Sequence, residues 1–239
     1  MKKVPMPTPR QIADEWDRAA PTRERQIATG KDHSAIHVLA PAILQAAAQC
    51  DVSRVLDVGC GTGWLTVLIA HNAAEVLGVD PSGVSIEIAR KHHNAANVRY
   101  EEATVESLAE RMPNTFTLAF ANMTLSTSPN LSLALGAVSA LLKPRRRFLF
   151  TIPHPCFFPT YWHYANEPWF EYGSEIAISE RFHILAETSD FQTTHVHRPL
   201  ERYVSELSAA GFRIIGACEL TGNGFHLPRF LLINAEKAG

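Results

Sequence analysis

One short stretch indicates the fold of this chain: VLDVGCGTG, residues 55–63. Its first four residues have the apolar character of a buried strand, three glycines follow at alternate positions, and a helical segment begins at Trp64. Glycines between a strand and a helix let the backbone approach a ligand closely. The stretch therefore predicts an α/β fold with a ligand at this strand-to-helix turn.

The next apolar stretch ends in the acidic residue that a nucleoside ligand needs. Residues 76–79 lead into Asp80, about 20 residues beyond the first glycine, where a carboxylate can accept hydrogen bonds from both hydroxyls of an adenosine ribose. NAD and S-adenosylmethionine both present such a ribose. Asp57 favours the second, because a carboxylate at the mouth of the turn repels a pyrophosphate and suits a cationic sulfonium and ammonium.

Apolar segments of strand and helix character alternate on both sides of this turn. Strands are predicted at 55–58, 76–79, 98–100, 117–121 and 147–152, and helices at 37–50, 64–71, 84–93, 105–111 and 131–142. Strands joined through helices by right-handed crossovers form a parallel sheet. A helix over 200–210 and strands at 212–218 and 230–235 complete the pattern.

The alternation divides the chain into four segments. Residues 1–36 are polar and proline-rich and form an N-terminal arm, with one predicted helix over 12–20, that could close over a site as a lid. Residues 37–152 form the cofactor-binding core. Residues 153–199, rich in aromatic side chains and histidines, form a substrate-cap insertion. Residues 200–239 supply the last helix and strand pair of the core.

Composition excludes several classes of protein. A formal net charge of −2 lacks the basic surplus of a dedicated nucleic-acid binder. The four cysteines are scattered without a C-x-x-C pair, so neither a zinc site nor a disulfide framework is indicated. No apolar run resembles a signal peptide or a membrane span. We expect a cytoplasmic monomer or homodimer with a small-molecule partner, no nucleic acid and no membrane.

These stretches resemble the motifs of class I, Rossmann-like S-adenosylmethionine-dependent methyltransferases. VLDVGCGTGWLT (55–66) resembles the first motif and VLGVDPS (76–82) the second, while residues 116–130 and 141–155 match later motifs of the small-molecule branch in order and spacing. The end of the chain resembles the family's antiparallel strand pair. The resemblance implies three layers around a seven-stranded, mostly parallel sheet with one antiparallel strand, and S-adenosylmethionine as cofactor across the carboxyl ends of the first strands.

The resemblance also implies the cofactor-binding residues. They are Asp57, Gly59, Cys60 and Gly61 around the methionine portion, Asp80 and Pro81 at the ribose, and Asn122 and Met123 beside the sulfonium. One departure concerns the adenine. Thr104 stands where the family often has an acidic residue that contacts the amino group, so adenine recognition is expected to rest on Thr104 and on the backbone of Val105.

Two histidines are the candidates for a general base. His154 follows the fifth strand at its carboxyl end, on the same edge as the glycine turn, and either serves as a base or fixes the prolines that flank it. His197 precedes the helix at 200–210 and either faces the pocket or ends a surface strand. Methyl transfer is an in-line displacement from an activated donor, so a base is optional for a nitrogen acceptor.

The acceptor site is expected in the aromatic insertion. Trp16 of the arm faces it from the other side, and the insertion supplies Phe157, Tyr161, Trp162 and Tyr164. Such rings suit a flat aromatic or heteroaromatic acceptor, as in secondary metabolism, although they could equally form a small core of the insertion.

Other branches and functions leave weaker signals. Residues 121–124 lack the N-P-P-[FY] signature of nucleic-acid base methylation, and 124–129 lack the carboxylates of a metal-dependent site, so no metal is expected. We expect O- or N-methylation of a small metabolite. A nicotinamide-dependent oxidoreductase and a non-catalytic, cofactor-binding scaffold protein remain as alternatives.

Overall fold

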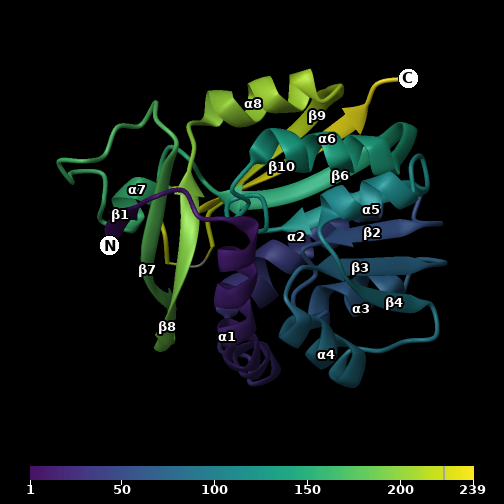
Figure 1. Cartoon of the computed structure of the whole chain (residues 1–239), viewed down its shortest axis with the longest axis horizontal. Helices are drawn as coiled ribbons and strands as arrows, with labels where there is room; N and C mark the ends of the chain where they lie inside the picture. Colours follow the sequence, from purple (N-terminus) through teal and green to yellow (C-terminus); the bar gives the residue numbers. More distant parts are fainter. Residues whose placement is uncertain (223) are drawn as a thin grey trace.

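A seven-stranded sheet with the order β4-β3-β2-β5-β6-β10-β9 forms the centre of the computed structural model, which describes residues 1–222 and 224–239 (Figure 1). The first five strands of this order are parallel, and β10 is antiparallel to both of its neighbours. This confirms the predicted sheet with one antiparallel strand. The strands are β2 (Val55–Val58), β3 (Val76–Asp80), β4 (Val98–Glu102), β5 (Phe116–Asn122), β6 (Leu142–Pro153), β9 (Phe212–Leu220) and β10 (Phe230–Lys237).

Helices cover both faces of the sheet, because successive strand side chains point to opposite faces. On β5, Leu118 and Phe120 pack with α2 (Ala40–Ala47) and α3 (Trp64–Ala70), whereas Ala119 and Ala121 pack with α5 (Val105–Arg111) and α6 (Leu131–Leu141). The helices α4 (Gly83–His92) and α8 (Leu200–Ala209) complete the layers (Figure 1). Core strands buried on both faces read as continuous apolar runs, which is why the sequence located them well.

The N-terminal arm is more regular than its sequence indicated. The helix α1 (Pro9–Ala28) begins earlier than the predicted segment, because Thr8 and Gln11 form a reciprocal capping box. It also continues past the predicted end at residue 20 and through the exposed Pro21. The predicted helix over 37–50 consists of a π-helical turn, η1 (Ala35–Leu39), and the shorter α2.

The cap insertion contains a β-hairpin that the sequence analysis did not predict. After the short helix α7 (Phe158–Tyr161), strands β7 (Ile176–Ile184) and β8 (Glu187–His197) pair antiparallel, and β1 (Lys2–Val4) adds to β7. The resulting three-stranded sheet, order β1-β7-β8, stands beside the main sheet (Figure 1). The strand β8 is mostly polar, and Phe191 and Val196 are its only large apolar residues, so little in the sequence indicated the hairpin.

Polar contacts hold α1 against this hairpin. Glu187, at the hairpin turn, accepts hydrogen bonds from Arg25, from Gln26 at 2.9 Å and from Lys31 at 2.8 Å. Further along β8, the Glu15 carboxylate accepts from the Thr194 amide at 2.6 Å. The arm and the cap therefore form one wall. No helix in the described part of the chain is long and apolar enough to cross a membrane.

Candidate active site

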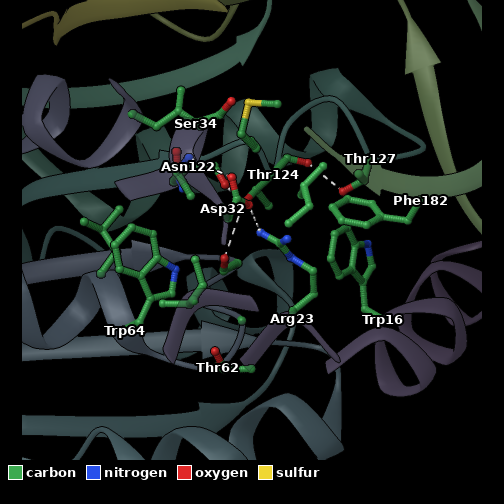
Figure 2. A pocket seen from close by; sticks show the side chains of 18 of the residues that line it. Trp16, Arg23, Asp32, Ser34, Thr62, Trp64, Asn122, Thr124, Thr127 and Phe182 are labelled. Atoms are coloured by element: carbon green, nitrogen blue, oxygen red, sulfur yellow. Dashed lines mark hydrogen bonds and ion pairs between the residues drawn. The ribbon is translucent and has the colours of Figure 1, made fainter. Parts of the chain in front are cut away.

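A cavity of about 270 Å³ lies between the carboxyl ends of the parallel strands and the wall formed by α1 and the cap (Figure 2). Residues from several segments line it. The glycine turn and the ends of β3 and β5 form its floor, the arm forms one side, and α7 with β7 forms the other. This is the position in which open α/β sheets bind ligands.

The glycine turn has the backbone conformation that its sequence predicted. Gly59, Gly61 and Gly63 all have positive φ angles, of 69°, 54° and 85°. The amides of Gly59 and Cys60 donate to the Val79 carbonyl at 2.8 and 3.0 Å, which ties the turn to the end of β3. A Cβ on Gly61 would meet no protein atom within 4 Å, and Gly61 lines the cavity. The turn thus leaves an open cradle on the cavity side.

Asp80 is held beside this cradle by two backbone amides. Its Oδ2 accepts from the Gly61 amide at 2.9 Å and its Oδ1 from the Ser82 amide at 2.9 Å. Burial raises the pKa of Asp80 to about 6, although both amides favour the ionised form. The carboxylate is therefore fixed in orientation at the end of β3. The two amides offset its negative charge only in part.

Asp57 is a second buried carboxylate on the cavity floor. It is 2 % exposed, and its Oδ2 accepts a hydrogen bond from Thr66 Oγ1 at 2.6 Å. Burial raises its pKa to about 7, opposed by Thr66 and reinforced by the neighbouring Asp80. Two adjacent acids with raised pKa values form a place where a bound cation would be stabilised.

The loop after β5 lies opposite the glycine turn. Asn122 and Met123 line the cavity, and Met123 has a positive φ of 63° that its two hydrogen bonds to Thr151 maintain. Thr124, which the sequence analysis did not single out, also lines the cavity and donates from its Oγ1 to the Gly59 carbonyl at 3.3 Å. Its contact with the turn depends on the parallel pairing of β5 with β2, two strands that are far apart in the sequence.

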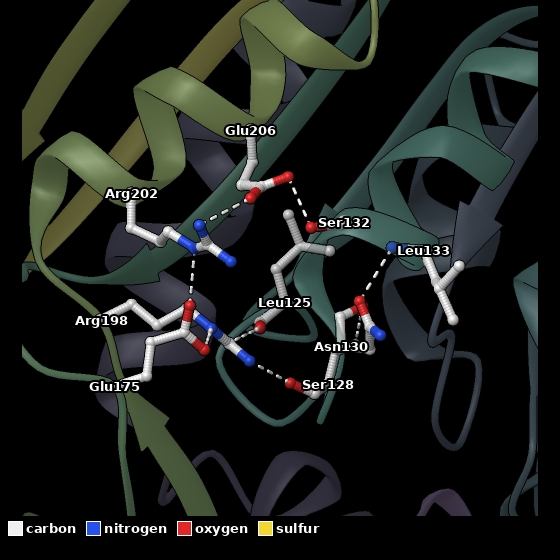
Figure 3. Close-up of polar contacts among 9 residues, drawn as sticks. All are labelled: Leu125, Ser128, Asn130, Ser132, Leu133, Glu175, Arg198, Arg202 and Glu206. Carbon is white, nitrogen blue, oxygen red and sulfur yellow. Dashed lines mark hydrogen bonds and ion pairs between the residues drawn. The ribbon is translucent and has the colours of Figure 1, made fainter.

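The loop is fixed from the other side by Arg198, a fully buried residue that the sequence analysis left without a role (Figure 3). Its Nη1 donates to the Leu125 carbonyl at 3.1 Å, and its Nη2 donates to the Ser128 carbonyl at 2.6 Å. Its Nε bonds to the Glu175 carboxylate at 3.1 Å. Arg198 thereby ties the end of the cap to the loop that carries Asn122 and Met123.

Thr104 and Val105 lie outside the cavity lining. The Thr104 hydroxyl caps α5 by accepting from the Ser107 amide at 3.2 Å, and the Val105 side chain packs into the main core. The cap uses one of the two lone pairs of this hydroxyl. The adenine contacts expected of these two residues gain no support from the cavity lining, in contrast to Pro81, which lines it next to Asp80.

The aromatic wall uses a partly different set of rings from the expected one. Trp16 and Trp162 line the cavity, whereas Phe157, Tyr161 and Tyr164 do not. Residues 158 and 162 share a face of α7, and their rings stack at 4.8 Å between centroids. Tyr161 instead bonds to the Leu227 backbone, and Tyr164 packs in the cap core. Phe182 of β7, which the sequence analysis missed, meets Trp16 edge to face at 6.3 Å (Figure 2).

Neither of the two expected base candidates lines the cavity. His154 is buried, with Nε2 3.0 Å from a Glu219 carboxylate oxygen and Nδ1 accepting from the Cys156 amide. His197 is buried as well, with Nε2 3.0 Å from the Tyr172 carbonyl. His154 thus fixes the turn after β6, which agrees with the structural alternative. His183 is the histidine that the described cavity lining contains.

Comparison with known proteins identifies the family and its fold. A family model described as a methyltransferase domain matches residues 8–215. The chain belongs to this methyltransferase-domain family. The matched range spans α1 and the whole cap. The three-layer sheet described above is accordingly the class I methyltransferase fold.

Individual curated relatives match only part of this methyltransferase-domain protein. The ubiquinone biosynthesis O-methyltransferase of Pseudomonas fluorescens strain Pf0-1 is 34% identical over 100 residues, 41% of this chain and 43% of that protein. The chain thus spans less than half the length of the curated relatives that head the comparison.

Two solved structures cover more of the chain. A protein of Listeria monocytogenes described as an S-adenosylmethionine-dependent methyltransferase is 25% identical, with a TM-score of 0.68 over 84% of this chain and 98% of that one. The 1,6-didemethyltoxoflavin N1-methyltransferase of Burkholderia thailandensis, solved with its substrate and S-adenosylhomocysteine, is 19% identical, with a TM-score of 0.64 over 100% and 94%. At that identity the second likeness shows the fold alone.

Proposed function

We propose that this chain binds S-adenosylmethionine on the cavity floor and transfers its methyl group to an oxygen or nitrogen of a small, flat aromatic metabolite. The observation that carries the proposal is the pair of buried carboxylates, Asp57 and Asp80, beside the open cradle at Gly61. Burial raises the pKa values of both acids, and a cationic donor would favour their ionised forms. The cradle at Gly61 leaves room for such a donor next to the backbone.

The residues divide between the two ends of the cavity. Asp80 and Pro81 would hold the ribose, while Asp57 and the turn of Gly59, Cys60 and Gly61 would hold the methionine portion. Asn122 and Met123 would stand beside the sulfonium. The acceptor would lie against the rings from the arm and cap, which are Trp16, Phe158, Trp162 and Phe182.

Bound S-adenosylmethionine supplies an already activated methyl group, so the chain itself has to align the acceptor and exclude water. The contact between Trp16 and Phe182 joins arm to cap over the cavity. The Glu187 contacts with α1 and with Lys31, just beyond it, hold the same wall in place. An acceptor with a nitrogen nucleophile or an acidic hydroxyl reacts in such a site without a dedicated base.

Titration calorimetry with S-adenosylhomocysteine, followed by mass spectrometry of an acceptor screen with S-adenosylmethionine, tests the proposal. We expect binding at a one-to-one ratio and a mass gain of one methyl group on a flat aromatic acceptor. NADH binding in place of S-adenosylhomocysteine would support the oxidoreductase alternative. Tight cofactor binding with no methylated product across the screen would support the scaffold alternative.

The affinity for S-adenosylhomocysteine is expected to rise with pH between 5 and 8. In the free protein Asp57 and Asp80 hold protons up to pKa values of about 7 and about 6. A ligand that carries an ammonium group favours the ionised acids, so binding releases a proton below these values. As the pH is lowered below these values, the affinity falls by up to about tenfold per pH unit for each proton that binding releases. Calorimetry in two buffers of different ionisation enthalpy measures this release.

The conservative variant Asp57→Asn is the matched control, since an amide oxygen can still accept from Thr66. It is expected to bind more weakly at pH 8 and to show a flatter pH profile. The stability of the free protein changes with pH in the direction opposite to the affinity for S-adenosylhomocysteine. Because the folded pKa values exceed the unfolded value of 3.8, the stability contributed by these acids falls as the pH rises above that value and is fully lost once the pH has passed about 6 for Asp80 and about 7 for Asp57. A dissociation constant that does not vary with pH would contradict this account.

A further inference from the structure

One wall of the cavity carries two arginines and one carboxylate. Arg23 of α1 donates from Nη2 to Asp32 Oδ2 at 2.6 Å (Figure 2), and the other oxygen of Asp32 accepts from the Ala35 amide at 3.0 Å. Asp32 is buried, so this pair is shielded from solvent. Both oxygens of Asp32 are therefore already engaged, and Arg23 neutralises its charge.

Arg229 is the second arginine of this wall, and it lacks such a partner. Its Nη1 donates to Ser34 Oγ at 3.1 Å, while its Nε is buried without a hydrogen-bond partner among the described residues. No carboxylate in the described part of the chain lies within ion-pair distance of it, although the charge of Asp32 acts on Arg229 and opposes the lowering of its pKa by burial. The guanidinium lies over the rings of Phe225 and Phe230, at 4.2 and 5.1 Å from their centroids. Arginine stays charged at physiological pH even when burial lowers its pKa.

The cavity is consequently polarised. The floor near the glycine turn holds two acids, Asp57 and Asp80, whereas the wall holds two guanidinium groups for the single carboxylate of Asp32. Arg229 is half-buried, and protein atoms cover its Nε, but its Nη2 is neither covered nor hydrogen-bonded within the described part of the chain. Nη2 can therefore donate to a ligand in the cavity, and a charge-assisted bond to a carboxylate is stronger than one between neutral groups.

Strand order places Arg229 on the acceptor side. It immediately precedes β10, which lies two strands beyond β5, and neighbouring strands are about 4.8 Å apart. The donor residues lie at the ends of β2, β3 and β5. The Arg229 carbonyl accepts from the His154 amide at 2.8 Å, which joins it to the segment that leads into α7. The guanidinium and the stacked rings of Phe158 and Trp162 thus line the same end of the cavity.

We propose that Arg229 binds a carboxylate of the methyl acceptor, and that the acceptor is therefore an aromatic acid. This inference rests on the proposed function and names the substrate class of the same site. The ring of the acceptor lies against Phe158 and Trp162, and its carboxylate accepts from Nη2 of Arg229. The methionine portion of the donor also carries a carboxylate, so the same chemistry has two sources, which the experiment below separates.

The experiment measures binding of 2-naphthoate and of its uncharged twin, 2-naphthamide, to the protein with and without saturating S-adenosylhomocysteine. We expect the acid to bind the native protein at least about tenfold more tightly than the amide, in line with a charged hydrogen bond. In Arg229→Gln this preference disappears, and in Arg229→Lys it is reduced. Arg213→Gln, which alters an exposed arginine on β9, keeps the native preference.

The affinity of each variant for S-adenosylhomocysteine separates the two sources and also reports on folding. The proposal requires that Arg229→Gln binds S-adenosylhomocysteine within about twofold of native protein. It is overturned if native protein shows no preference for the acid, or if the preference survives in Arg229→Gln. A loss of S-adenosylhomocysteine affinity with the acid preference retained would assign Arg229 to the donor instead. If S-adenosylhomocysteine fails to bind even native protein, the proposed function fails, while the acid-to-amide comparison without it still tests Arg229.

Discussion

Replacing Gly59 by alanine is expected to destabilise the folded protein by about 2–5 kcal/mol, the sum of left-handed backbone strain and overpacking. Gly59 has a φ of 69°, which disfavours any residue with a Cβ. The added Cβ would also lie 2.9 Å from Thr124 Cβ and still closer to the Thr124 Cγ2 and Oγ1. In a chain of this size the loss corresponds to a fall in melting temperature of about 5–15 °C, which calorimetry or circular dichroism measures.

Two further variants isolate the cause. Gly61 also has a positive φ, but a Cβ there would point into the open cavity and not against Thr124. Gly61→Ala is therefore expected to lose only the backbone strain of about 1–2 kcal/mol in stability. It should also weaken S-adenosylhomocysteine binding, because the Cβ occupies the cradle. The double variant Gly59→Ala with Thr124→Gly removes the clash and should recover part of the stability. Equal destabilisation by Gly59→Ala and Gly61→Ala would mean that the contact with Thr124 does not matter.

Replacing Asp80 by alanine is expected to reduce the affinity for S-adenosylhomocysteine by about 100-fold or more. The carboxylate orients the Gly61 and Ser82 amides, and under the proposed function it also accepts from the ribose. Two charge-assisted hydrogen bonds lost at about 1.5 kcal/mol or more each account for that factor. Titration calorimetry of both proteins at pH 8, where the acid is ionised, gives the comparison.

The isosteric variant Asp80→Asn separates binding from folding. It removes a buried charge whose pKa is raised to about 6, but one of the two amides that Asp80 accepts from then faces the Asn NH2 group, so these two effects oppose each other and the net change in stability at pH 8 is expected to be small. Its affinity should nevertheless fall, because only one oxygen remains to accept. An Asp80→Ala protein that binds within about threefold of native, or an Asp80→Asn protein that unfolds, would show that Asp80 acts chiefly in the fold.

The donor side of this protein is a local feature of the chain. The strand at 55–58, the three glycines and Asp80 lie within one βαβ unit, so their spacing along the sequence already determines their geometry. The parallel strands are equally readable, since burial on both faces leaves continuous apolar runs such as residues 118–121. For these reasons the fold and the proposed cofactor site could be predicted from residues alone.

The acceptor side depends on contacts between distant segments. The sequence pointed to the aromatic insertion, yet the helical phase of α7 places Phe158 and Trp162, and not Phe157 or Tyr161, at the cavity. Likewise His154 has the sequence position of a base, but its ring bonds to Glu219 on a strand far along the chain. A side chain's direction within an irregular insertion is set by packing, which spacing does not record.

The sequence by itself determined the sheet, the glycine turn and the two acids, because each arises from neighbours along the chain. Only the tertiary structure decided what faces them: Thr124 against Gly59, Phe182 against Trp16, and the unpaired Arg229 beside the aromatic wall. These groups come from segments far apart in the chain that meet only when β10, the cap and α1 pack over the strand ends. Their burial and charge balance, which carry the acceptor proposal, exist only after that packing.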